Sequence, residues 1–244
     1  MRRIGSLVCA LAILSCAAPP PVAAPLPTTV PSVGALPTQG PEPSLPIGDR
    51  LSSAQADFDC DGRDDRLEFF ERLGAVPPGS STLARLTLAS GSASEVVLTG
   101  DEGFAPLIGL TDVNGDGCAD AIVSVGHGAS TVWTGFLVYD ESLRRVEEDG
   151  APAMFLFAGS VRHGNSIECR RTKDAPEIVA RAASDYTSDF QWDVVEDVHR
   201  WSSKSRLVPW STSRFVIVVS VAYSAPPDMA RYWGLSCGTV RFPG

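Results

Sequence analysis

The chain has 244 residues, of which 44% are hydrophobic and 20% charged, and its net charge is −9 at neutral pH. An acidic chain without a basic stripe is a poor partner for nucleic acid, so we expect no nucleic-acid binding. The folded part, which we expect over residues 50–244, is long enough for one domain with a sizeable core.

The first residues are typical of an export signal. Arg2 and Arg3 precede an apolar run over residues 4–18. A membrane span needs about 20 residues, so this run fits a secretory signal better. The run ends in Ile13-Leu14-Ser15-Cys16, which resembles the lipobox of bacterial lipoproteins. The resemblance implies a signal peptide over residues 1–15 and a lipid on Cys16, with an ordinary secreted protein as the alternative.

Residues 16–49 have the composition of a tether. Ten of the 19 prolines lie between Pro19 and Pro46. Such a segment cannot form a helix interior or a central strand and favours extended polyproline II. The sequence therefore predicts an extracytoplasmic domain in the bacterial cell envelope, held at a membrane through its lipid anchor.

Two acidic loops share one pattern. The first reads D-x-D-x-D-G-x-x-D from Asp57, and the second reads D-x-N-x-D-G-x-x-D from Asp112. Ca²⁺ requires six to eight oxygen ligands, which a short loop supplies only if its backbone turns sharply. We expect two structural Ca²⁺ ions. The predicted side-chain ligands are Asp57, Asp59, Asp61 and Asp65 in the first loop and Asp112, Asn114, Asp116 and Asp120 in the second, with backbone carbonyls from Arg63 and Cys118.

Strand-like runs follow each loop, because apolar residues alternate with polar ones and β-branched or aromatic residues are frequent. These runs cover residues 67–73, 83–88 and 95–98 after the first loop, and 121–126, 132–139 and 143–146 after the second. A third unit begins at Cys169. Two of its loop positions hold the cations Arg171 and Lys173, which would repel Ca²⁺, so we expect no ion there. We still expect strands over 178–180, 190–201 and 206–210. A further strand is expected over 215–221.

A period of 50 to 60 residues with several strands per unit is typical of propeller blades or a related β array. We therefore expect an all-β fold, a propeller-like array of three to four antiparallel blade-like units with calcium-binding loops. The expected units span residues 50–103, 104–160 and 161–213, with a tail over 214–244.

The second unit carries a family resemblance. Phe104-Ala105, the run over 112–117 and Val125-Gly126-His127-Gly128 resemble the FG-GAP/VCBS repeats of integrin α-chain propellers and of many bacterial surface proteins. The resemblance implies Ca²⁺-stabilised loops between strands and an adhesive or scaffolding role. It does not imply catalysis, so we do not expect an enzyme.

Two other functions stay open as alternatives. An EF-hand is suggested by Glu68 at position 12 of the first loop, but Val123 occupies that position in the second loop and a strand follows it. An extracytoplasmic hydrolase could build a site across the β units. Gly234-Leu235-Ser236-Cys237-Gly238 matches a nucleophile motif, but neither an acid nor a histidine follows it, as that motif requires.

Outside the signal region the chain has four cysteines, which in an exported protein suggest two disulfides with three possible connectivities. The sequence does not choose among these; we favour Cys60–Cys118 with Cys169–Cys237. Five tryptophans are expected mainly in the core between units. An exposed aromatic platform for a protein or glycan ligand is the alternative.

Overall fold

The computed structural model describes residues 45–74, 81–99, 105–173 and 175–243. The predicted lipid site Cys16 and most of the expected tether lie outside the described residues, as does Phe104 of the repeat signature. Residues 43–244 form one unit. Its described elements are strands apart from α1, a single helical turn at Ala230–Trp233. The all-β prediction is therefore confirmed.

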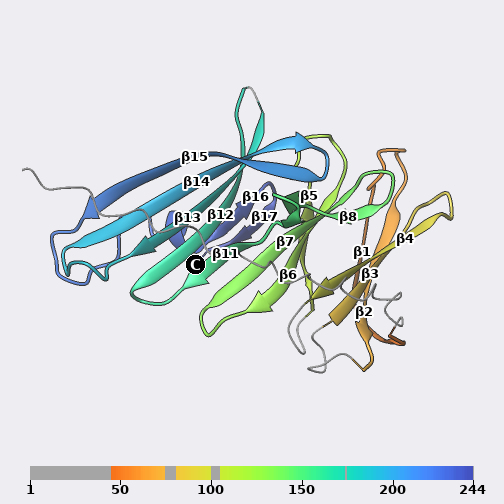
Figure 1. Cartoon of the computed structure of the whole chain (residues 1–244), viewed down its shortest axis with the longest axis horizontal. Helices are drawn as coiled ribbons and strands as arrows, with labels where there is room; N and C mark the ends of the chain where they lie inside the picture. The colour runs from red at the N-terminus through yellow and green to blue at the C-terminus, as the bar shows by residue number, and fades with distance from the viewer. Residues whose placement is uncertain (1–44, 75–80, 100–104, 174, 244) are drawn as a thin grey trace, which may run out of the picture. The chain divides into compact units, whose positions relative to one another are not determined.

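The first sheet is a four-stranded antiparallel meander in chain order (Figure 1). Its strands are β1 (Ile47–Ala56), β2 (Asp65–Arg72), β3 (Ser81–Thr87) and β4 (Ala93–Thr99). Leu67 and Phe69 are two residues apart on β2, so they point to the same face. Both are fully buried there.

The second sheet contains the remaining 13 strands, with the path β10-β9-β15-β14-β13-β12-β11-β7-β6-β5. The strands are β5 (Leu107–Thr111), β6 (Asp120–His127), β7 (Thr131–Tyr139), β8 (Leu143–Arg145), β9 (Glu147–Glu148), β10 (Ala151–Pro152), β11 (Phe155–Gly159), β12 (His163–Arg171), β13 (Pro176–Ser184), β14 (Gln191–Ser203), β15 (Arg206–Val218), β16 (Leu235–Cys237) and β17 (Val240–Phe242). β16 adds to β12 in parallel, β17 pairs with β16, and β8 pairs with β7.

β6 and β7 are buried on both faces, which places them at the centre of the core. Ala121 and Val123 on β6 pack with buried residues of the first sheet, such as Phe69. The intervening Ile122 packs with Phe155, Ile167 and other buried residues of the second sheet. A strand covered on both sides reads as a near-continuous apolar run, as this one does.

Among the described residues, the strands form one four-stranded sheet and one 13-stranded sheet, and no closed propeller is seen. Only the first unit is a separate blade-like sheet. β11, in the expected second unit, pairs with β12, in the expected third unit, so strands of these two units share one sheet.

The loop expected from Cys169 to Glu177 is also different from the prediction. β12 runs to Arg171, a short turn closed by Thr172 and Ala175 follows, and β13 begins at Pro176. The strands expected over 206–210 and 215–221 form one strand, β15, because Ser211–Arg214 continue the pairing with β14. The polar residues between the two apolar runs hid this continuity.

Candidate metal centre

Both acidic loops connect neighbouring antiparallel strands. The first joins β1 to β2, and the second joins β5 to β6. In each loop the second residue is apolar and buried: Phe58 is 0% exposed and Val113 is 2% exposed. These side chains anchor the loops to the core, and the neighbouring Asp57, Asp59 and Asp112 stay nearer to solvent.

The two loops share three hydrogen bonds from backbone N–H groups to side-chain oxygens, at equivalent positions. In the first loop, Gly62 N donates to Asp57 Oδ2 at 2.9 Å, Asp61 N to Asp59 Oδ1 at 3.1 Å, and Arg63 N to Asp61 Oδ1 at 2.9 Å. The equivalent bonds of the second loop are Gly117 N to Asp112 Oδ2 at 3.0 Å, Asp116 N to Asn114 Oδ1 at 2.9 Å, and Cys118 N to Asp116 Oδ1 at 2.9 Å.

Both loops have glycine at the sixth position because the backbone there adopts a left-handed conformation. Gly62 has φ +84° and Gly117 has φ +90°, in the left-handed region that other residues rarely adopt. This conformation turns the backbone back toward the first aspartate of the loop. The repeated motif therefore has a repeated local structure.

The first loop gathers three carboxylates. Ligand oxygens of Asp57, Asp59 and Asp61 lie within 4.8 Å of one another, the only such group of three acidic, histidine or cysteine side chains found among the described residues. The pKa of Asp59 is raised by desolvation and by repulsion from Asp65, Asp61 and Asp57. A hydrogen bond from Arg63 lowers the pKa of Asp61. A cation among these oxygens would relieve the repulsion at Asp59.

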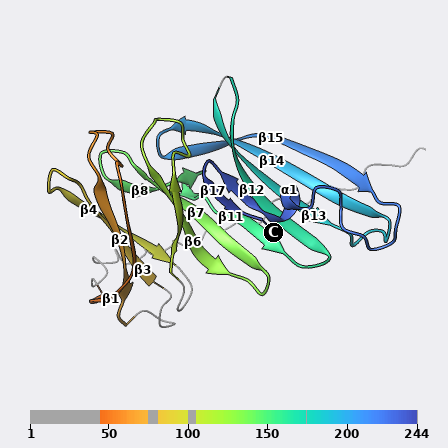
Figure 2. The ribbon, with the colours of Figure 1, turned by 180° about the vertical axis from the view of Figure 1, so that it is seen from behind.

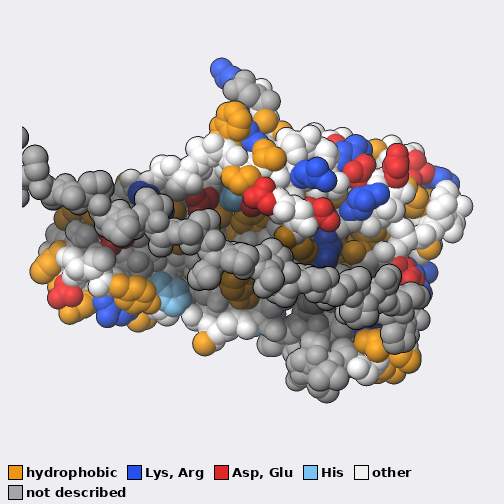
Figure 3. All heavy atoms as spheres, in the orientation of Figure 1, with side chains coloured by type: hydrophobic (Ala, Val, Ile, Leu, Met, Phe, Trp, Pro, Cys, Tyr) orange, Lys and Arg blue, Asp and Glu red, His pale blue; other side chains and the backbone are white. Residues whose placement is uncertain are grey.

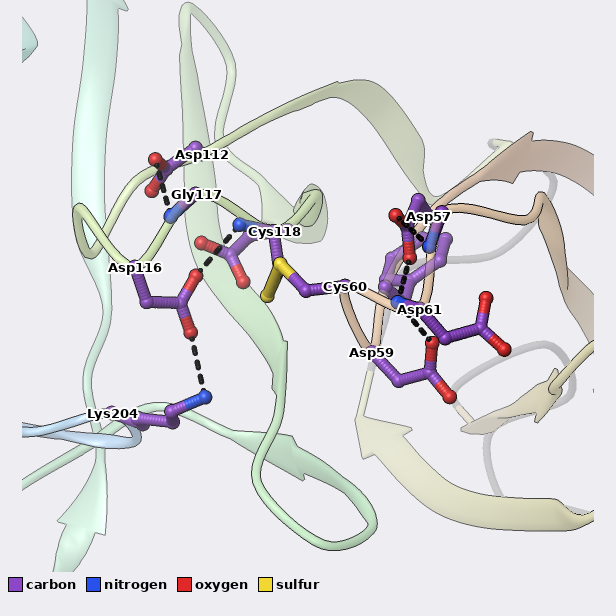
Figure 4. The surroundings of a disulfide bond; sticks show 12 residues. Asp57, Asp59, Cys60, Asp61, Asp112, Asp116, Gly117, Cys118 and Lys204 are labelled. Carbon is purple, nitrogen blue, oxygen red and sulfur yellow. Dashed lines mark hydrogen bonds and ion pairs between the residues drawn. A yellow bond between two sulfur atoms is a disulfide. The ribbon is translucent and has the colours of Figure 1, made fainter.

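The second loop is neutralised by the protein itself. Arg171 at the end of β12 lies 2.8 Å from a carboxylate oxygen of Asp112, and Lys204 lies 3.2 Å from Asp116. Figure 4 shows Lys204 reaching Asp116 on one side of a disulfide, with the three carboxylates of the first loop on the other side. Despite their common backbone, the two loops differ in their readiness to accept a metal ion.

The ninth residue of each loop, predicted as a ligand, is buried and clamps the backbone. Asp65 is 1% exposed and accepts hydrogen bonds from Phe58 N and Ala89 N, both at 2.8 Å. Asp120, also 1% exposed, accepts from Val113 N at 2.9 Å. Burial, together with repulsion from nearby acids, raises the pKa of Asp120 to about 8. Neither residue joins the group of three carboxylates.

Both favoured disulfides are present. Cys60 is bonded to Cys118, which ties the two loops together, and Cys169 is bonded to Cys237, which ties β12 to β16. A backbone hydrogen bond of 2.9 Å from Ala119 N to Asp57 O also joins the loops. Disulfides persist in oxidising compartments, so the protein belongs outside the cytoplasm. Among the described residues, no helix has the length and apolar character to cross a membrane.

The structure does not favour the two alternative motifs. Each loop lies between strands, not between the two helices of an EF-hand, and Glu68 pairs with Arg50 and Arg66. Ser236 lies within β16, whereas a nucleophile elbow sits between a strand and a helix. In the described part of the chain, no histidine is hydrogen-bonded to Ser236.

Sequence reasoning missed the counter-ions of the second loop. Arg171 lies 59 residues from Asp112 along the chain, and Lys204 lies 88 residues from Asp116. The sequence places Arg171 at an acidic loop position of the third unit, but its partner depends on how β12 runs past the second loop. No local pattern in the sequence carries that information.

Comparison with known proteins gives no relative: no family model, characterised protein or solved structure matches the chain. The fold and the cysteines define a class nevertheless. The chain is an extracytoplasmic all-β protein with two disulfides.

Proposed function

We propose that this chain is a calcium-stabilised lipoprotein of the bacterial envelope whose β domain has a binding or scaffolding role. The observation that carries the proposal is the first loop, where three carboxylates converge within 4.8 Å around a glycine turn. Oxygen-rich loops of this kind suit Ca²⁺, and extracellular calcium modules bind at about 10⁻⁴–10⁻³ M. We also propose that the repeated units are related to FG-GAP/VCBS repeats.

The first loop is proposed as the stronger of two sites. A cation at the second loop would compete with Arg171 and Lys204 for the same carboxylates. Both ion pairs are partly exposed, and such pairs contribute only about 0.2–1 kcal/mol, so Ca²⁺ can displace them at higher concentration. The expected order of filling is first loop, then second.

Calorimetric titration of the full chain with Ca²⁺ tests this order. Asp59→Asn should weaken the tighter binding event, because it removes one of the three clustered carboxylate charges. Asp112→Asn removes a carboxylate from the second loop, whose third position is already Asn114, and should leave the tighter event in place. Absence of any binding heat at millimolar Ca²⁺ would rule out the proposed ions.

Anchoring through Cys16 is proposed from the lipobox resemblance alone. The expected result is that the chain sediments with the membrane fraction of expressing bacteria, whereas Cys16→Ser moves it to the soluble extracytoplasmic fraction. Cys9→Ser, in the same segment, is the control and should not change the distribution. A soluble wild-type chain would point to ordinary secretion.

The face shown in Figure 3 has acidic and basic side chains interspersed among its described residues, with no large patch of one sign. A surface of this kind gives no support to nucleic-acid binding, for which a basic face is the usual signature. We therefore place the proposed partner among proteins or glycans.

A further inference from the structure

Two hollows lie over β12 and the C-terminal strands. The larger, about 740 Å³, is lined by residues of β12, β13, α1, β16 and β17. The smaller, about 540 Å³, extends toward the second acidic loop at Asp112. Both volumes fall within the 300–1,000 Å³ typical of ligand pockets. Glu168, Arg170, Ser236 and Arg241 line both hollows, so together they form one groove.

The groove is built on paired strands and is flanked by α1. β12 pairs with β13 on one side and with β16 on the other, and β17 extends the sheet beyond β16. α1 packs against β12 and β13, as Figure 2 shows from behind. The Cys169–Cys237 disulfide fixes β16 to β12. A site on such a sheet is held in shape before any ligand arrives.

The buried charged side chains beneath the groove are already paired with one another. The Arg181 side chain is 3% exposed and donates to Glu168 at 2.7 Å and to Glu196 at 2.6 Å. Glu177, 2% exposed, accepts from Arg170 at 2.6 Å and from Arg200 at 2.9 Å. These pairs make a rigid polar floor and leave little unpaired charge below the surface.

Arg241 stands apart from this network. It lines both hollows, and within the described part of the chain its side chain has no hydrogen-bond or ion-pair partner. Arg170 binds Glu177 through Nε and one terminal nitrogen, so its other terminal nitrogen remains for a ligand. Four arginines and two acids line the larger hollow of a chain whose net charge is −9. Arg170, Arg181 and Arg231 are paired with acids, so Arg241 supplies the unpaired positive charge of the groove.

Other groups in the groove suit hydroxyl-rich ligands. Glu168, whose side chain is 37% exposed, and Asp228 can accept hydrogen bonds, while Ser236 can donate or accept. Phe242 is 43% exposed and offers an aromatic surface beside them. A planar guanidinium binds a carboxylate through two parallel hydrogen bonds. A carboxylate, several hydroxyls and an apolar ring face occur together in sugar acids.

We propose that this groove binds an acidic saccharide, with its carboxylate on the Arg241 guanidinium and its hydroxyls on Glu168, Asp228 and Ser236. An acidic peptide would use the arginines but would leave the carboxylates of Glu168 and Asp228 repelling it. The inference rests on the proposed binding role and names the ligand class. It does not depend on the calcium loops.

An array of acidic and matched neutral glycans, with polyglutamate spots, tests the ligand class with the full chain as probe. We expect capture on sialylated or uronate-bearing glycans and no capture on their neutral counterparts. Titration of sialyllactose and of a hyaluronan tetrasaccharide, with lactose as the neutral control, then gives affinities. Arg241→Gln should weaken binding about tenfold or more, as expected for the loss of a charge-assisted hydrogen-bond pair.

Two further variants sharpen the result. Arg241→Lys keeps the positive charge but loses the planar guanidinium that makes two parallel hydrogen bonds. Its affinity should therefore lie between those of the wild type and Arg241→Gln. Arg214→Gln on β15 removes an arginine that does not line the groove and should bind like the wild type. A melting curve for each variant separates loss of binding from loss of fold.

Absence of capture on every acidic glycan would overturn the inference, as would undiminished binding by a folded Arg241→Gln. Polyglutamate bound as tightly as the acidic glycans would reduce the groove to a general anion site and also contradict it. Calcium titration of the same samples tests the proposed function separately. A chain that binds Ca²⁺ but no acidic glycan leaves the calcium proposal standing and removes this one.

Discussion

Glu177 is the residue on which two arginines converge. Burial opposes its ionisation, but hydrogen bonds from Arg170 and Arg200 outweigh burial and lower its pKa below the ordinary value. A carboxyl group with a lowered folded-state pKa binds a proton more readily in the unfolded chain. Its contribution to stability is therefore present above the unfolded pKa and is lost as pH falls through the folded pKa.

We predict that Glu177→Gln lowers the free energy of unfolding at pH 7 toward the lower end of about 1.5–3 kcal/mol, because its two arginine partners are partly exposed. The deficit should shrink as pH falls from the ordinary glutamate pKa through the lower folded-state pKa, because the folded wild-type carboxyl then binds a proton and loses its charge. Urea denaturation at pH 7 and near pH 3 measures both values.

Glu95→Gln is the control for this experiment. Glu95 pairs with Arg85 on the exposed side of the first sheet, with its side chain 44% exposed. Exposed pairs contribute little, so the control should change stability by less than about 1 kcal/mol at either pH. A Glu177 deficit that stays constant with pH would show that packing, not charge, sets its effect.

At the scale of elements, the two loops form one stapled pair. The Cys60–Cys118 bond joins residues 58 apart in sequence, and the bond from Ala119 N to Asp57 O lies beside it. Chain-entropy reasoning assigns a cross-link of this length about 4 kcal/mol, since it restricts the unfolded chain.

The double variant Cys60→Ser/Cys118→Ser should lose stability of that order in urea denaturation under non-reducing conditions. The wild type treated with a reductant should fall further, because both disulfides then open. Cys9→Ser, which lies in the expected signal peptide, serves as the control. A double variant as stable as the wild type would mean that the loops are held by packing alone.

The sequence predicted several strands of the first two units, because their runs are rich in apolar, β-branched or aromatic residues and glycine or serine clusters separate them. β2, β3, β4, β6 and β7 all overlap runs expected from alternation. β1 was not predicted, since Gly48, Asp49, Arg50, Ser52 and Ser53 give it little apolar periodicity. Its place in the sheet is set by pairing with β2.

The candidate metal site could likewise be predicted only in part from the sequence. The loop backbone could be predicted because the glycine and the aspartates act locally within nine residues. The ion pairs from Arg171 and Lys204 could not, because they depend on strands that meet only after folding. The separate blades expected for the second and third units are not seen for a related reason: β9 of the second unit pairs with β15 of the third, and such a long-range pairing is not visible in the sequence.

At the scale of the whole molecule, burial and charge are organised around different elements. The apolar core is centred on β6 and β7, whereas the acidic loops lie at the ends of β1 and β5. An ion bound at these loops would stabilise the connection between the two sheets, which the Cys60–Cys118 disulfide also makes. Calcium should therefore raise the stability of the entire unit and not of one loop alone.

The most direct test is a thermal melt of the full chain in 10 mM Ca²⁺ and in EDTA, with Asp59→Asn and Asp116→Asn alongside. One site of 10⁻⁴–10⁻³ M affinity stabilises the folded state by about 1.4–2.7 kcal/mol, or roughly 3–10 °C in Tm. We predict such a rise for the wild type, with most of it lost in Asp59→Asn and a smaller part lost in Asp116→Asn. An unchanged Tm with Ca²⁺, or a full response in Asp59→Asn, would contradict calcium stabilisation through the first loop.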